Sequence, residues 1–290
     1  MREIATAAPL PHRYLGLELS GAKNQKTALA TIEYYPKERK IFLLDLYDRI
    51  LPAEGQTGDQ ALLELIHEVS PGLALMGVNV PLTLPPCMTC SRTRCRTQCS
   101  QASVKWMREL TRKASKQRDL RVLEFTPYTQ RPIELWVRYR VLPLISENQQ
   151  FEIDEALGGN RAPLTARMHF LKDFLPTAKV VEAWPKLTVA LLSSGLDLDP
   201  RIFARYRQLE EGAHARSKIL EAMSLKFGLF IYDRDLKKLS ASLAAFDAFI
   251  CAYTALLSDT GGCEKMPPGF PAAAGWLHYP RGQKSARGRR

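Results

Sequence analysis

Apolar and polar positions along the chain follow patterns that predict an α/β protein. Near the N-terminus, three runs rich in β-branched and aromatic residues are joined by short, turn-rich connectors. They predict an antiparallel meander of strands at residues 13–19, 27–34 and 40–47. Residues 58–69 then show helical apolar spacing, and a continuous apolar run ending near Asn79 predicts a buried strand.

The remaining pattern is mostly helical. Apolar spacing and prolines at helix starts predict helices over residues 102–116, 131–141, 163–174, 186–192, 200–211, 214–227 and 236–257. Residues 178–183 predict one more strand, which places Glu182 at its carboxyl end before Trp184 and Pro185. Since no repeat or linker divides the chain, we expect one domain over residues 13–280, with flexible ends at 1–12 and 281–290.

A cysteine-rich insertion at residues 86–100 carries the most specific chemical signal. Its four thiols follow a C-x2-C-x4-C-x3-C spacing: Cys87, Cys90, Cys95 and Cys99. Four thiolates in so short a loop suit a closed tetrahedral zinc site, and an iron–sulfur cluster is the alternative. The interleaved Arg92, Arg94 and Arg96 would offset the negative charge of such a site and point outward to a nucleic-acid phosphate.

Composition narrows the classes of protein to consider. No apolar run is long enough to span a bilayer, and residues 1–13 lack the apolar centre of a signal peptide, so we expect a cytoplasmic protein without a membrane partner. The net charge of +11 is concentrated, with ten Lys/Arg against two acids between residues 92 and 121, and five more cations from residue 281 onward. This distribution predicts a nucleic-acid partner, although a solvated basic face is the plainer interpretation.

Acidic residues in apolar surroundings mark a candidate catalytic site. Glu18 lies in an apolar strand, Glu182 ends another, and Asp247 lies on an apolar helix. We expect the strands ending at Leu19, Asn79 and Glu182 to be neighbours. Their carboxyl ends would then lie together, and in such sheets ligands gather at that edge. Carboxylates brought together there would bind Mg²⁺ or Mn²⁺ through oxygen.

The order and spacing of five motifs resemble a family of predicted RNase H-like nucleases that is otherwise listed as a domain of unknown function. The motifs are LGLELSGA at 15–22, GVNVPL at 77–82, VEAWP at 181–185, AFDAF at 245–249 and GWLHYP at 275–280. The resemblance implies a mixed sheet in the order β-β-β-α-β-α-β-α, with an inserted four-cysteine loop and a helix-rich C-terminal half.

The resemblance also implies a function and a set of site residues. Glu18, Asn79, Glu182 and Asp247 match the family's ligands for two divalent cations in phosphodiester hydrolysis. Two positions depart from the family's usual Asp. Glu18 has a longer side chain, and the amide of Asn79 brings no negative charge. The alternatives are a catalytically silent nucleic-acid-binding protein and a nucleotide-binding ATPase relative, in which SGAK at 20–23 would cradle a phosphate.

Overall fold

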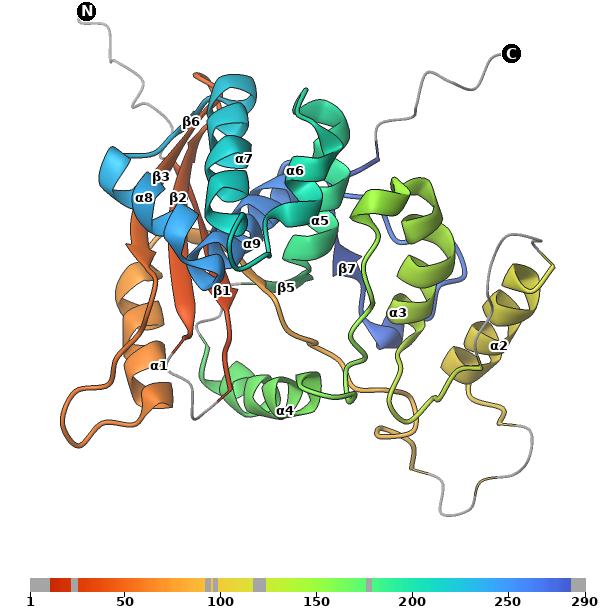
Figure 1. Ribbon diagram of the computed structural model, residues 1–290. Helices are drawn as coiled ribbons and strands as arrows, with labels where there is room; N and C mark the ends of the chain where they lie inside the picture. The colour runs from red at the N-terminus through yellow and green to blue at the C-terminus, as the bar shows by residue number, and fades with distance from the viewer. Residues whose placement is uncertain are drawn as a thin grey trace, which may run out of the picture.

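The computed structural model describes residues 11–21, 26–91, 95, 99–116, 124–175 and 179–282. Within these residues the chain forms a mixed seven-stranded sheet with the order β6-β3-β2-β1-β4-β5-β7 (Figure 1). Its strands are β1 (His12–Glu18), β2 (Ala28–Tyr35), β3 (Lys40–Tyr47), β4 (Leu73–Val78), β5 (Lys179–Ala183), β6 (Leu229–Phe230) and β7 (Leu277–His278).

Helices occupy most of the remaining described chain. The α-helices are α1 (Gly58–Val69), α2 (Ala102–Ala114), α3 (Pro132–Trp136), α4 (Arg161–Leu171), α5 (Pro185–Leu192), α6 (Pro200–Arg205), α7 (Gly212–Phe227), α8 (Asp233–Ala241) and α9 (Leu243–Asp259). Short 3-10 or π segments are η1 (Val137–Val141), η2 (Leu142–Leu144), η3 (Glu147–Gln149), η4 (Lys172–Phe174), η5 (Ser193–Gly195) and η6 (Ala272–Ala274).

Strand pairing confirms the predicted α/β arrangement. β1 is antiparallel to β2, and β2 to β3, so the meander forms as its short connectors predict. β1 is parallel to β4, and β4 is parallel to β5, which makes the strands before Leu19, Asn79 and Glu182 neighbours as expected. β6 and β7 were not predicted, because two residues are too few to show an alternating pattern.

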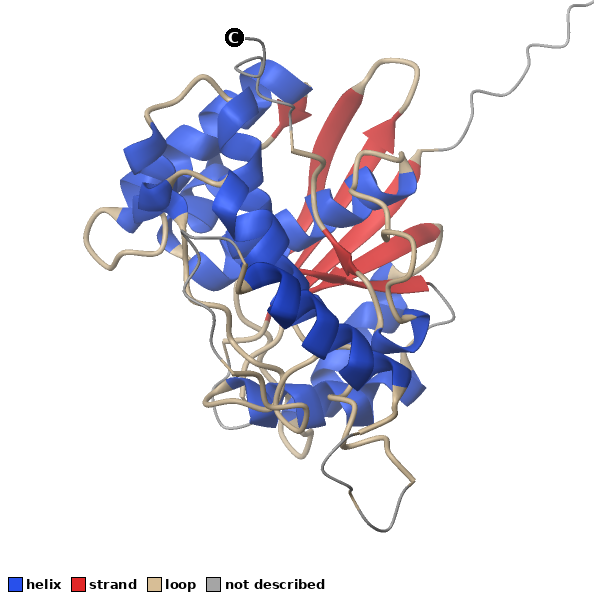
Figure 2. Cartoon of the chain, turned by 90° about the vertical axis from the view of Figure 1, so that its right-hand side faces the viewer, coloured by secondary structure: helices blue, strands red, loops and turns tan. Residues whose placement is uncertain are grey.

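Helices cover both faces of the sheet. On one face, α1 and α4 pack over Leu15, Leu17 and Val78. On the other face α9 lies across β1, β2 and β4, with α7 and α5 beside it. Figure 2 shows the twist of the sheet and the helices packed against it. α2 lies at the end of the molecule opposite α1, where its apolar side packs on α3 and η1 (Figure 1).

Most predicted helices shift by a few residues at their ends, and two of them are divided or leave the helix early. The segment 236–257 is split between α8 and α9, because the Ser242 hydroxyl accepts a hydrogen bond from the Ala245 amide and begins a new helix. The segment 200–211 leaves the helix after Arg205, where the Arg216 guanidinium donates to the Tyr206 carbonyl at 2.6 Å. In the described chain no single helix is long and apolar enough to cross a membrane, and α8 with α9 passes only as a pair bent by 111°.

Two glycines let α9 approach the sheet closely. A Cβ atom at Gly16 would overlap the Ala248 carbonyl and the Ala252 amide, and one at Gly77 would overlap the Cys251 carbonyl. Because all these overlaps are with helix backbone, no side-chain rotation can relieve them. The glycines therefore set the height of α9, and with it the position of Asp247.

Replacing Gly16 with alanine should lower the free energy of unfolding by about 3 kcal/mol or more, because α9 must move away from β1 to accept the methyl group. Urea denaturation would measure the change. Gly21→Ala is the matched control, since a Cβ at Gly21 meets no atom within 4 Å. Equal stability of the two variants would show that the α9 contact is not tight.

Candidate active site

The first two predicted site residues, Glu18 and Asn79, lie side by side at the carboxyl ends of β1 and β4. Leu17 is the register partner of Val78, and the Asn79 amide donates to the Leu17 carbonyl at 3.0 Å. The side-chain amide Nδ2 of Asn79 donates to Glu18 Oε2 at 2.6 Å. Side chains alternate along a strand, so both residues project to the α9 face, like Gly16 and Gly77 two residues earlier.

Asp247 reaches the same place from α9. It directly precedes Ala248, the residue whose carbonyl contacts Gly16, and its side chain is only 1% exposed. Its Oδ2 accepts a hydrogen bond from Arg207, a residue that follows α6. The structure therefore brings three of the four predicted acid or amide residues together from β1, β4 and α9.

Glu18 and Asn79 open into a cavity of about 230 Å³ that also contains three cations, Arg161, Lys186 and Arg207. Arg161 fixes Asn79 by donating to its backbone carbonyl at 2.7 Å and to its side-chain oxygen at 3.2 Å. The other lining residues are Phe151, Glu152, Ile153, Asp154, Asn160, Leu164 and Trp184. The cavity thus combines the half-buried Glu18 carboxylate with three basic side chains on its walls, and Asp247 is not among its lining residues.

The two acids, of which Asp247 is buried and Glu18 half-buried, are poorly compensated. Burial raises the pKa of Glu18 to about 8, and the negative charge of Asp247 adds to this, against the hydrogen bond from Asn79 and the charges of Arg161 and Arg207. Burial likewise raises the pKa of Asp247, although Arg207 opposes it. Oδ1 of Asp247 is buried without a hydrogen-bond partner in the described chain. Such a group is costly to keep, which is typical of functional sites.

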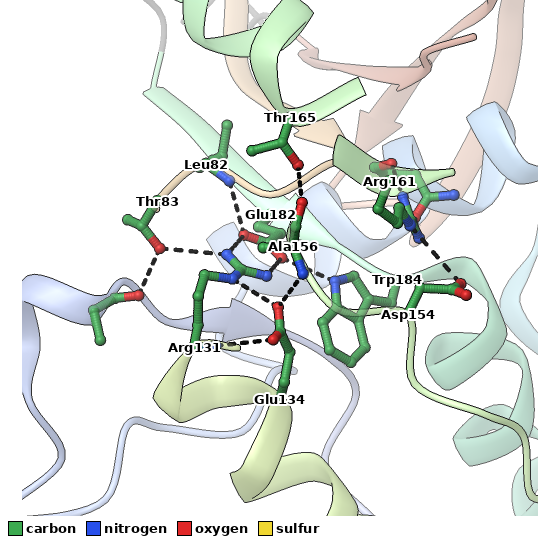
Figure 3. Close-up of polar contacts among 12 residues, drawn as sticks. Leu82, Thr83, Arg131, Glu134, Asp154, Ala156, Arg161, Thr165, Glu182 and Trp184 are labelled. Atoms are coloured by element: carbon green, nitrogen blue, oxygen red, sulfur yellow. Dashed lines mark hydrogen bonds and ion pairs between the residues drawn. The ribbon is translucent and has the colours of Figure 1, made fainter. Parts of the chain in front are cut away.

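Glu182 is held elsewhere, in a satisfied ion cluster (Figure 3). Arg131 donates to its two carboxylate oxygens at 2.7 and 2.8 Å, and also to Glu134 at 2.8 Å. The Leu82 amide and the Trp184 indole donate to it at 3.0 and 2.9 Å. Burial alone would raise the pKa of Glu182, but Arg131 and these hydrogen bonds outweigh it, so the pKa is lowered.

The expectation that Glu182 shares a pocket with Glu18 is therefore not met, and the sheet register gives the reason. Glu182 is the register partner of Val78, not of Asn79. Because cross-strand partners project to the same face, Glu182 points to the α1 face with Val78. Among the described residues, no three His, Cys, Asp or Glu side chains are arranged to hold a metal ion.

The cysteine loop is only partly described. Cys87, Cys90, Cys95 and Cys99 are free thiols, and burial, followed by the negative charges of the other three, raises the pKa of Cys87. Zinc or an iron–sulfur cluster at these thiols stays a prediction. Arg92, Arg94 and Arg96 lie outside the described residues, as does Lys23 of the SGAK turn.

Sequence reasoning missed the three cations of the cavity. Arg161 begins α4, Lys186 is in the first turn of α5, and Arg207 follows α6. Each is one basic residue among many in a chain with 41 Lys and Arg, and no spacing connects it to Glu18. Only the packing of these segments over the carboxyl ends of β1 and β4 reveals them.

The chain matches no protein-family model, no curated protein and no solved structure. Function must therefore be inferred from the geometry and chemistry of the site.

Glu18→Gln should change the pH dependence of stability in metal-free buffer. In the folded protein the pKa of Glu18 is about 8, above its ordinary value of 4.5, so the folded state binds this proton more tightly than the unfolded state. The contribution of Glu18 to stability is therefore fully present below pH 4.5 and is lost as the pH rises to about 8. Wild type should lose stability relative to Glu18→Gln across this window, at a slope approaching about 1.4 kcal/mol per pH unit.

Urea denaturation at several pH values would measure that difference. Asp247, Arg161, Arg207 and Asn79, the groups that act on the Glu18 carboxyl, are retained in both proteins. Parallel pH profiles for the two proteins would contradict the raised pKa.

Proposed function

We propose that this chain is an RNase H-like phosphodiesterase acting on nucleic acid, in which Glu18 and Asp247 hold one Mg²⁺ or Mn²⁺ and Arg161, Lys186 and Arg207 bind the phosphate. The sheet supports this proposal, because an antiparallel meander continues into parallel strands β4 and β5, in the order that the sequence motifs imply. Acids at the end of the first strand and on a late helix fit the same plan.

The observation that carries the proposal is the contrast between the Glu182 cluster and the pair formed by Glu18 and Asp247. Both oxygens of Glu182 have partners, and the pKa of that carboxyl is lowered. Asp247 instead has an orphaned oxygen, and the pKa values of Glu18 and Asp247 are raised. The first cluster needs no further ion, whereas a divalent cation would satisfy the second.

The donor set fits one cation better than two. Mg²⁺ is commonly bound by one or two carboxylates together with water and substrate phosphate. Glu18 and Asp247 supply two carboxylates, while Glu182, the third acid that a second cation would require, faces the other side of the sheet. A bound cation would supply Lewis-acid activation of a water molecule or of the phosphate.

Each of the three cations of the cavity has its own protein contacts, and these contacts set where it would bind a phosphate. Arg161 is held by Asn79 and, at 3.8 Å, by the half-exposed Asp154, which keeps its guanidinium at the cavity wall. Lys186 also pairs with Asp154, at 3.2 Å. Arg207 contacts Asp247, so a phosphate bound to Arg207 would lie next to the buried acids. This arrangement would place a phosphodiester beside the carboxylates.

A longer nucleic-acid contact would use the exposed face of α2. Arg112 and Lys113 pair with Glu109, at 2.9 and 3.4 Å. Lys105 and Arg108 on α2, and Lys116 just after it, are exposed, and in the described part of the chain they have no acidic partner. Unpaired surface cations are suited to phosphate-backbone binding, which is independent of sequence and sensitive to salt.

One observation favours the second candidate, a catalytically silent nucleic-acid-binding protein. The side-chain amide of Asn79 donates to Glu18 and accepts from Arg161, so it is already occupied on both sides. Arg207 likewise occupies one oxygen of Asp247, Oδ2. In this alternative the arginines would replace the cation permanently.

A cleavage assay and a binding assay separate the two candidates. Labelled DNA and RNA would be incubated with the protein in Mg²⁺, in Mn²⁺ and in EDTA, and binding would be followed at several salt concentrations. The phosphodiesterase proposal expects cleavage that depends on the cation. Binding that weakens with salt, without cleavage under any condition, would favour the silent protein.

Asn79→Asp should tighten Mn²⁺ binding by about tenfold, equivalent to about 1.4 kcal/mol, because a third carboxylate joins Glu18 and Asp247. Calorimetric titration would measure the affinity. Asn160→Asp is the matched control, since Asn160 lies at the exposed rim of the same cavity. Unchanged affinity in Asn79→Asp, or an equal gain in the control, would show that position 79 does not contact the cation.

A further inference from the structure

A second, smaller cavity adjoins the proposed active site. It has a volume of about 110 Å³, and Phe151, Lys186 and Arg207 line both cavities. These three residues form a shared wall of one aromatic ring and two cations, in which the Lys186 ammonium lies 5.9 Å from the centre of the Phe151 ring. The phosphodiesterase proposal uses the two cations but gives no role to the space behind them.

The chemistry of the second cavity differs from that of the first. Ala190, Phe203 and Tyr206 give it an apolar, partly aromatic lining, and all three are buried. Besides Lys186 and Arg207, its polar lining residues are the amides Asn148, Gln149 and Gln150. No acidic residue lines it in the described chain, whereas Glu18, Glu152 and Asp154 line the first cavity.

Hydrogen bonds hold two of these amides in fixed positions. Gln149 donates to the Pro200 carbonyl at 3.3 Å and accepts from the Ser193 hydroxyl at 3.1 Å. Gln150 donates to the carbonyls of Leu142 and Ile145, both at 3.3 Å. These bonds occupy the Gln149 amide, whereas in the described chain the side-chain oxygen of Gln150 and the amide of Asn148 have no partner. These two open groups beside an apolar lining suit a flat, heteroaromatic ring that both stacks and hydrogen-bonds.

We propose that the second cavity receives one unstacked nucleobase of a single-stranded nucleic acid, with the phosphate of that nucleotide on the shared wall at Lys186 and Arg207. This inference rests on the proposed function, since it identifies the substrate as single-stranded. The cavity is far below the volume of about 300 Å³ or more that whole drug-sized ligands occupy, so it admits a base alone. The phosphate must then remain outside, where the two cations are.

The arrangement also excludes a paired base. A base in a duplex is stacked on both faces and bonded along its Watson–Crick edge, so it cannot enter a cavity of this size without unpairing. A base in a single strand can turn out at a much lower cost. Through Arg207, the phosphate of such a nucleotide would lie next to Asp247 and Glu18.

The test narrows the second cavity by placing a larger side chain at its edge. Ala204 is exposed on α6 and lines the second cavity but not the first. Ala204→Leu therefore narrows the second cavity without disturbing the core. Ala213→Leu is the matched control, because Ala213 is exposed on α7 and lines neither cavity. Binding of a labelled single-stranded oligonucleotide, as DNA and as RNA, and of the matching duplex would be followed by fluorescence anisotropy in EDTA.

Ala204→Leu should weaken single-strand binding by about tenfold and leave duplex binding unchanged, while Ala213→Leu should bind both like wild type. A strand of the same length without any bases should bind wild type no more tightly than the intact strand binds Ala204→Leu. Unchanged single-strand binding by Ala204→Leu, or an equal loss for the duplex, would overturn the base-binding cavity.

The outcome is independent of catalysis, because EDTA removes the cation. Absence of cleavage in Mg²⁺ and Mn²⁺, together with the expected anisotropy results, would reject the phosphodiesterase while keeping the base-binding cavity. Cation-dependent cleavage with no effect of Ala204→Leu on binding would keep the phosphodiesterase and reject the base-binding cavity.

Discussion

Asp247→Asn should reduce cation-dependent cleavage of nucleic acid by about 100-fold or more, because it removes one of the two carboxylates that would hold the cation. Stability in metal-free buffer should stay the same or rise, since Asp247 is buried, has an orphaned oxygen and raises the pKa of Glu18. Cleavage of a labelled oligonucleotide in Mn²⁺ and thermal unfolding in EDTA would measure the two effects.

Asp259→Asn is a suitable control on the same helix. Its side chain is 42% exposed and accepts a hydrogen bond from the Tyr14 hydroxyl at 2.7 Å, far along α9 from the proposed site. This variant should cleave like wild type. If Asp247→Asn also cleaves like wild type, the reaction does not take place at the α9 site.

Arg131→Met should lower the free energy of unfolding by about 3–5 kcal/mol at neutral pH, because it leaves Glu182 and Glu134 buried without their cation. The pKa of Glu182 is lowered in the folded state, so the contribution of the pair is present above the ordinary pKa of 4.5 and is lost as the pH falls through the folded value. In the variant, Glu182 can become neutral by binding a proton. The difference between variant and wild type should therefore shrink toward acid pH.

Urea denaturation at several pH values would follow this difference. Arg201→Met is the control, because Arg201 also pairs with a carboxylate, that of Asp199, but both side chains are exposed, by 71% and 49%. Such surface pairs contribute about 1 kcal/mol or less, so the control should unfold almost like wild type. A similarly small effect of Arg131→Met would show that the buried cluster is not needed for stability.

The sequence predicted the sheet well where local pattern and chain connection agree. The short connectors of the meander fix the pairing of β1, β2 and β3, and the apolar spacing of residues 58–69 gives α1 its observed bounds. Glu18, Asn79 and Asp247 could be brought together because strand ends and an apolar helix are the places where unpaired polar groups indicate function.

Register and ion pairing could not be predicted in the same way. A shift of one residue moves a strand side chain to the opposite face, and no local pattern shows whether Glu182 or Ala183 is the partner of Val78. The partner of Glu182 is Arg131, 51 residues away in sequence. The cations of the cavity are even farther from Glu18 along the chain, so only the folded structure assigns them.

The close contact of α9 with the first strands has a consequence for synthesis of the protein. β1, β2 and β4 leave the ribosome early, yet the helix that covers them spans residues Leu243–Asp259. Until then the nascent chain has an uncovered apolar sheet face, a condition that favours aggregation and chaperone binding. Docking of α9 closes this face and, in the same event, places Asp247 beside Glu18, so a nascent chain that ends before α9 lacks the complete acidic site.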